Sequence, residues 1–136
     1  MDSIQLRPLS DTEAKALEDG LELAARLVGS KRPLSVEAVQ HLYDVLRTDH
    51  PGYVEGQIAA GLSFGQLIVD KTGWQWMRVT DSYGEETAVS PDGYELACYP
   101  ISMLQKRLKE GTITDIAVLC EATIAQIKDM IESGDY

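Results

Sequence analysis

Cysteine, basic residues and long apolar runs are all scarce in this sequence of 136 residues. Its two cysteines, Cys98 and Cys120, are too few for a disulfide scaffold or for a zinc site with four cysteine ligands. No apolar stretch approaches the ~20 residues that a membrane-spanning helix needs, and the first residues lack the basic flank and apolar core of a signal peptide. These absences predict a cytoplasmic protein that does not associate with membranes.

The shortage of basic residues also limits the kinds of partner. The chain has 12 lysines and arginines against 22 acidic residues, which gives a formal net charge of −10 at pH 7. Such a surface repels a phosphate backbone. The densest basic run, Lys106, Arg107 and Lys109, is explained by the favourable position of cations near a helix C-terminus. The composition therefore argues against nucleic acid and anionic membranes, and it allows a basic protein partner.

The remaining composition is that of a globular domain, with 44% hydrophobic and 25% charged residues. The length favours a single domain spanning residues 1–136, in which residues 1–9 form a loose N-terminal arm.

Capping signals predict three helices after this arm. Ser10 and Glu13 form a capping box that begins the first helix, which ends at Gly29, and Ser35 caps the second helix. The third helix runs from about Tyr53 to Lys71 and contains three glycines, each of which costs about 1 kcal/mol relative to alanine. This cost indicates that the glycines allow another element to approach the helix closely. The three glycines are Gly56, Gly61 and Gly65.

The pattern then changes from helical to alternating, which predicts a small sheet at the centre of the fold. The three predicted strands are Trp74–Thr80, Glu85–Val89 and Tyr94–Tyr99. Because the turns between them are short, the strands form an antiparallel meander, and both faces of it carry apolar side chains. Two helices follow, over Ile101–Glu110 and from about Thr114 onward. The predicted class is α+β: three N-terminal helices, a three-stranded antiparallel meander, and two C-terminal helices packed on the sheet.

The middle of the chain resembles a bacterial family called domain of unknown function 3806, from about Ile58 to Ile127. The segments that carry the resemblance are Gly73-Trp74-Gln75-Trp76, Val79-Thr80-Asp81-Ser82-Tyr83-Gly84, Tyr99-Pro100-Ile101-Ser102-Met103 and Lys106-Arg107. The resemblance implies the order of the helices and strands. It implies no activity, cofactor or catalytic residue, because the family has none assigned.

Two motifs invite a catalytic or metal-binding interpretation, and both have simpler explanations. Ser63 is the serine of a G-x-S-x-G pattern, but the pattern lies inside a predicted helix rather than at the strand-to-helix turn of a serine hydrolase. The two histidines lie close to acids that could complete a zinc site: His41, Asp44, Asp49 and His50. A helix histidine and a turn histidine account for them more simply. We therefore predict no catalytic residues, no metal and no cofactor.

The aromatic strand and its hairpin form the candidate binding surface. The residues assigned to it are Trp74, Trp76, Arg78, Asp81, Tyr83 and Glu85. In one interpretation both tryptophans belong to the core, because exposing two such rings would forgo roughly 7–12 kcal/mol of burial. In the other, Arg78 stacks on Trp76 at the rim of a groove that receives a ligand or peptide.

These observations leave two hypotheses for the function. The acidic surface and the missing catalytic set favour a non-catalytic interaction or regulatory module, which could neutralise a basic partner. The alternative is a small ligand-binding protein or enzyme that uses the aromatic face around Trp76 and Arg78. A pocket with converging polar groups would favour the second hypothesis, and a flat acidic face would favour the first.

Overall fold

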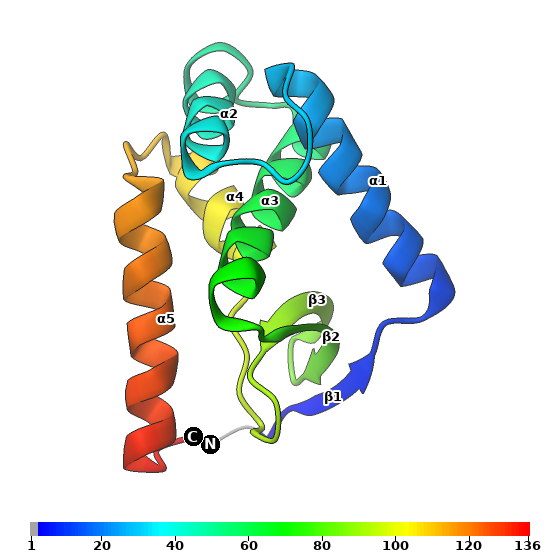
Figure 1. Ribbon diagram of the computed structural model, residues 1–136, viewed down its shortest axis with the longest axis vertical. Coiled ribbons are helices and arrows are strands. Elements are labelled where there is room, and N and C mark those ends of the chain that lie inside the picture. Colours follow the sequence, from blue (N-terminus) through cyan, green and yellow to red (C-terminus); the bar gives the residue numbers. More distant parts are fainter. Residues whose placement is uncertain (1–2) are drawn as a thin grey trace.

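Five helices and three strands make up residues 3–136, the part of the chain that the computed structural model describes (Figure 1). The strands are β1 (Gln5–Pro8), β2 (Gln75–Asp81) and β3 (Gly84–Ser90). The helices are α1 (Asp11–Val28), α2 (Val36–Asp49), α3 (Val54–Thr72), α4 (Pro100–Glu110) and α5 (Ile116–Ser133). The α+β class, the five helices and an antiparallel sheet of three strands are as predicted. Within residues 3–136 no helix has the length and apolar character needed to cross a bilayer.

The predicted caps begin the first two helices. The Ser10 hydroxyl accepts a hydrogen bond from the Glu13 amide at 3.1 Å, and the Glu13 carboxylate accepts one from the Ser10 amide at 2.8 Å. The Ser35 hydroxyl accepts from the Ala38 amide in the same way. Gly29 ends α1 with a φ of 66°, a left-handed conformation that glycine adopts without strain.

Helix α3, rather than the sheet, occupies the centre of the fold, so the predicted central position of the sheet is wrong. Eleven of the nineteen residues of α3 are buried, and α1, α2, α4 and α5 surround it (Figure 1). The glycines permit this: a Cβ atom at Gly61 would lie 2.6 Å from the Cα atom of Ile101 in α4. A Cβ atom at Gly65 would lie 2.3 Å from the ring of Trp76. The expected close packing at these glycines is confirmed.

The core consists of two clusters. The larger lies between α3 and helices α2, α4 and α5, and it includes Tyr43, Phe64 and Leu104, all fully buried. The smaller joins α1 to α3. Its members are Leu17, Leu21 and Leu62. Trp76 packs against both clusters, so this one side chain links the sheet to both parts of the core.

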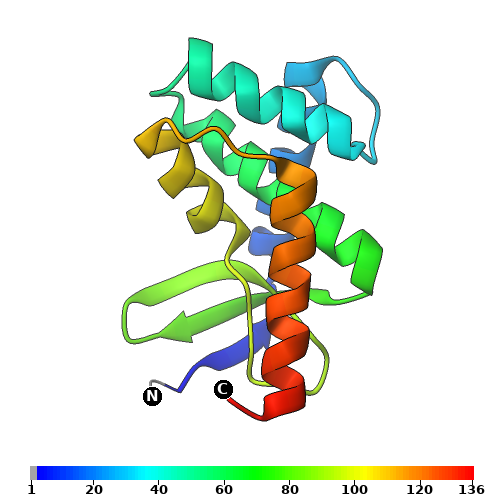
Figure 2. The ribbon, with the colours of Figure 1, turned by 90° about the vertical axis from the view of Figure 1, so that its left-hand side faces the viewer.

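The sheet lies at one end of the molecule, below α3 (Figures 1 and 2), and one of its strands is not the predicted one. Strands β2 and β3 confirm the predicted hairpin. The predicted third strand, Tyr94–Tyr99, is wrong: this segment meets β3 through a single bridge between Val89 and Cys98. The other edge of β2 pairs with β1, from Gln5 opposite Thr80 to Pro8 opposite Met77.

Separate contacts account for these two differences from the prediction. The segment after β3 turns through Gly93, which has a φ of 83°, and the Ser90 hydroxyl donates to the carbonyl of Leu96 at 2.7 Å. These contacts hold the segment as a loop. Residues 5–8, which were predicted to belong to a loose arm, instead pair with β2, and an ion pair between Arg7 and Glu85 at 2.8 Å adds to this attachment.

Candidate functional site

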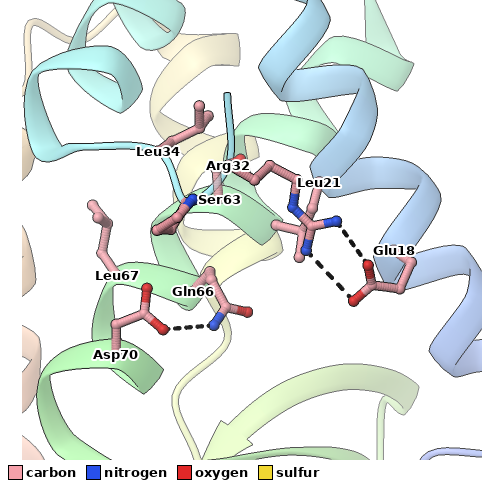
Figure 3. Close-up of a pocket in the computed structure, with 9 residues that line it drawn as sticks. Glu18, Leu21, Arg32, Leu34, Ser63, Gln66, Leu67 and Asp70 are labelled. Carbon is pink, nitrogen blue, oxygen red and sulfur yellow. Dashed lines mark hydrogen bonds and ion pairs between the residues drawn. The ribbon is translucent and has the colours of Figure 1, made fainter. Parts of the chain in front are cut away.

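A pocket of about 320 Å³ lies between α1, α3 and the connector that joins α1 to α2 (Figure 3). Its size falls at the lower end of the range for small-molecule sites. Polar and apolar side chains both line it. They are Glu18, Leu21, Arg32, Pro33, Leu34, Ser63, Gln66, Leu67 and Asp70.

One stripe of α3 forms a wall of the pocket. Ser63, Gln66, Leu67 and Asp70 are spaced by three, four and seven residues, and this spacing places them on one face of a helix. The face offers a hydroxyl, an amide and a carboxylate beside an apolar side chain. Most residues of α3 are therefore buried, and the stripe at the pocket carries side chains that can form polar contacts.

Arg32 forms the opposite rim and ties the connector to α1. Its guanidinium lies 2.7 Å from the Glu18 carboxylate and 3.1 Å from that of Glu22. The hydrogen bond from Arg32 is the main reason why the pKa of Glu18 lies below its ordinary value, and the same contact raises the pKa of Arg32. Both groups are therefore charged at neutral pH, with two carboxylates facing one guanidinium.

Gln66 connects the pocket to the aromatic strand. The indole N–H of Trp76 donates to Gln66 Oε1 at 3.0 Å, and Gln66 Nε2 donates to Asp70 Oδ1 at 2.8 Å (Figure 3 shows the second bond). An indole nitrogen can only donate, so it fixes which end of the amide is the oxygen. Trp76 thereby orients both Gln66 and the carboxylate of Asp70.

Ser63 is the unusual residue of the pocket. It is 3% exposed, and its hydroxyl is buried with no hydrogen-bond partner within residues 3–136. A buried polar atom without a partner costs about 1–3 kcal/mol. Ser63 lies within α3 and not at a strand-to-helix turn, and in the described part of the chain no histidine lines the pocket. The serine-hydrolase arrangement is therefore absent at this serine.

The predicted tryptophans lie in or beside the core, and neither lines this pocket. Trp74 is partly buried against the larger cluster, and Trp76 fills the space beside Gly65. Arg78 is held by the Glu85 carboxylate at 2.9 Å and the Thr87 hydroxyl at 3.1 Å. The structure places Trp76, Arg78 and Glu85 on one face of the sheet, and the role of the predicted residues in binding stays a prediction.

The rest of the predicted surface lies at the hairpin tip. Asp81 stabilises the turn, since its Oδ1 accepts from the Tyr83 amide at 2.8 Å. The Tyr83 side chain is 93% exposed. Glu85 is engaged by Arg7 and Arg78, so part of its charge is already compensated.

The histidines and cysteines offer no second reactive centre. His41 and His50 line a separate, mostly apolar hollow with Leu27, Val45 and Tyr53. In the described part of the chain, no three His, Cys, Asp or Glu side chains converge as a metal site would require. Burial raises the pKa of Cys98 to about 12 and also raises that of Cys120, which disfavours a nucleophilic thiolate at either position.

Four charged groups hold β1 against the hairpin and the start of α1. Arg7 donates to both oxygens of Glu13 at 2.8 Å and also pairs with Glu85, while Arg78 approaches both carboxylates. The hydrogen bond from Arg7, followed by that from the Ser10 amide, lowers the pKa of Glu13 to about 2.

We expect this cluster to make the attachment of β1 sensitive to acid. Because the folded-state pKa of Glu13 is lower than its ordinary 4.5, the cluster contributes its full stability above about pH 4.5 and loses it as the pH falls through 2. A ¹³C NMR titration of the Glu13 carboxyl should give a midpoint near 2. In Arg7→Gln the midpoint should move towards 4.5. A midpoint near 4.5 in the wild type would show that the bidentate pair does not persist in solution.

The residues that sequence reasoning missed are those of the pocket other than Ser63. Glu18, Arg32, Gln66 and Asp70 come from three separate segments of the chain. The sequence carries one usable signal for them, the polar stripe at 63, 66 and 70 in an otherwise apolar helix.

Comparisons with known proteins support the fold and a family. The family model described as "Domain of unknown function (DUF3806)" matches residues 36–119. A solved crystal structure of a protein from Bacteroides thetaiotaomicron VPI-5482 is similar, with a TM-score of 0.72 and 18% sequence identity. The similarity covers 90% of this chain and 47% of that one, so the present chain spans about half of its length. At this identity the likeness shows the fold alone. No curated protein matches the sequence significantly.

Proposed function

The chain belongs to the DUF3806 family, a domain of unknown function, and we propose that it is a non-catalytic binding domain that holds a small polar molecule in the pocket between α1 and α3. The site includes no histidine or cysteine that could activate Ser63 as a nucleophile. A cytoplasmic location is part of the proposal, and cell fractionation would test it.

The observation that carries the proposal is the buried hydroxyl of Ser63. Without a hydrogen-bond partner, this hydroxyl lowers the stability of the unliganded protein, and a ligand that supplied a donor or acceptor would remove that loss. The polar groups around it are already oriented, Gln66 by Trp76 and Arg32 by two glutamates. A site whose groups are fixed before binding loses little entropy when a ligand arrives.

Ser63→Ala tests the proposal through two opposite effects. We expect the free variant to be as stable as the wild type or more stable by about 1 kcal/mol, since an unsatisfied hydroxyl is removed. Small polar compounds that raise the melting temperature of the wild type should bind this variant at least tenfold more weakly.

Ser90→Ala is the matched control. The Ser90 hydroxyl is also buried, but it donates to the carbonyl of Leu96, so its loss should destabilise the protein by about 1–3 kcal/mol. If Ser63→Ala were destabilising to the same degree, the Ser63 hydroxyl would have a structural partner. If no polar compound bound the wild type, the pocket would not be a binding site.

The predicted basic protein partner is a second proposal, and the exposure of Tyr83 favours it. A tyrosine that is 93% exposed at a hairpin tip resembles the aromatic anchors of protein interfaces, and Asp81 and Glu85 lie beside it. A pull-down from native cells should recover one stoichiometric basic protein with the wild type and lose it with Tyr83→Ala. Equal recovery with both proteins would exclude the hairpin tip as the contact.

A further inference from the structure

The charged groups at the pocket are unbalanced. Among residues 3–136, Arg32 is the one cation that lines it, and it faces Glu18 together with the neighbouring Glu22. Asp70 adds a further carboxylate on the opposite wall. Three carboxylates and one guanidinium leave an excess of two negative charges.

Asp70 is the least compensated of these groups. It lies in the last turn of α3, where the helix dipole is already negative and disfavours an acid. The donor that it receives is the neutral amide of Gln66, and Asp70 forms no ion pair with any residue from 3 to 136. The adjacent Lys71 does not help, because its ammonium lies 2.6 Å from Glu121 of α5.

The hydrogen-bonding groups show the same bias. Ser63 has a free hydroxyl oxygen, and Asp70 has a second carboxylate oxygen that receives no bond from Gln66. Both terminal nitrogens of Arg32 already donate to the two glutamates of α1. The pocket therefore offers mainly acceptors, and a matching ligand brings donors.

An anionic ligand fits this arrangement poorly. It would have to displace a carboxylate from Arg32 and would then meet the like charge of Asp70, which lies on the exposed side of the pocket. The apolar walls, formed by Leu21, Leu34 and Leu67, suit a short chain of methylene groups. At roughly 30 Å³ per water-sized group, a cavity of about 320 Å³ holds a molecule of about ten heavy atoms.

We infer that the ligand is a small organic cation, an aliphatic amine or guanidine, with its charged end at Asp70 and a donor at Ser63. This inference rests on the proposed binding function of the same pocket. An ammonium carries three donors and no acceptor, which complements the free oxygens that the pocket presents.

Three four-carbon probes of nearly equal size test the ligand class by isothermal titration calorimetry. They are butane-1,4-diamine, butane-1,4-diol and succinate, which are cationic, neutral and anionic at neutral pH. The diamine should bind at least tenfold more tightly than the diol, and succinate should not bind. Affinity for the diamine should fall as salt is added, because part of the attraction is between charges.

Asp70→Asn locates the cation. Its affinity for the diamine should fall at least tenfold, and its affinity for the diol should change little. Asp129→Asn on α5 removes the same charge at an exposed position outside the pocket and should leave both affinities unchanged. Melting curves without ligand establish that each variant is folded.

The outcomes separate the ligand class from the binding function. Tighter binding of the diol or of succinate would overturn the cationic ligand and leave the pocket as a binding site. Equal losses in Asp70→Asn and Asp129→Asn would attribute binding to the overall negative charge and overturn the assignment of Asp70. If none of the three probes bound, while other polar compounds bound in a way that depended on Ser63, the cationic class would again be wrong. Absence of all binding would overturn both proposals.

Discussion

Gly61→Ala is expected to lower the free energy of unfolding by about 2 kcal/mol, although alanine is the better helix former. The new Cβ atom would lie 2.6 Å from the Cα atom of Ile101 and 3.1 Å from its nitrogen. These are backbone atoms, so no change of rotamer can relieve the contact. Helices α3 and α4 would have to separate, and the contacts between them would loosen along their length. Urea unfolding followed by far-UV circular dichroism measures the loss.

Gly20→Ala is the matched control for this effect. Gly20 also lies inside a helix, and its Cβ atom would lie 2.3 Å from Cδ1 of Leu62. That atom is the end of a flexible side chain, which can rotate away, while the gain in helix propensity is about 1 kcal/mol. The stability of Gly20→Ala should therefore stay within about 1 kcal/mol of the wild type. If both variants behaved alike, the close approach of α4 at Gly61 would not be a determinant of stability.

Local signals in the sequence predict the helices well because the physics that sets them is local. The capping box at Ser10 and the glycine at Gly29 act through hydrogen bonds and dihedral angles within a few residues. The α2 cap at Ser35 behaves in the same way. Each of these boundaries can be read without knowing what the helix packs against.

The third strand could not be predicted in this way, because its pairing joins segments that are far apart in the sequence. Tyr94–Tyr99 has the better alternating pattern but meets β3 through a single bridge, while residues 5–8 pair along the opposite edge of the hairpin, on β2. The contacts that hold β1 against the hairpin include the ion pair between Arg7 and Glu85, which are 78 positions apart. Four residues with one apolar side chain on the buried side give too weak a pattern to reveal that pairing.

The pocket shows the same limit. Sequence reasoning selected Ser63 because of a hydrolase motif. In the structure Ser63 lines the pocket, but it lies within α3 and lacks the arrangement of a hydrolase nucleophile. Its neighbours Glu18 and Arg32 meet α3 only because α1 folds back along it through the connector. The predicted aromatic strand contributes indirectly, since Trp76 orients Gln66 from behind the pocket wall.

Substitution of Trp76 should have the largest effect on stability. Trp76→Ala removes a ring that packs against both core clusters and beside Gly65, and it should cost about 3 kcal/mol, the lower end of the range for a core tryptophan because the side chain is partly exposed. Wild-type tryptophan emission should be blue-shifted and resist quenchers. Red-shifted, easily quenched emission would contradict the packed position and restore the groove interpretation.

Trp76→Phe separates packing from the hydrogen bond to Gln66. Phenylalanine keeps most of the apolar contact, so the loss of stability should be smaller than in Trp76→Ala, but Gln66 Oε1 loses its donor. Gln66 and Asp70 would then no longer be held in one orientation, and the affinity of the pocket for its ligand should fall at least tenfold. Trp74→Phe is the control, since Trp74 packs against the larger cluster and does not contact Gln66 through a hydrogen bond. Unchanged affinity in Trp76→Phe, with the loss of stability still present, would confine Trp76 to a packing role and separate the family's aromatic strand from the pocket.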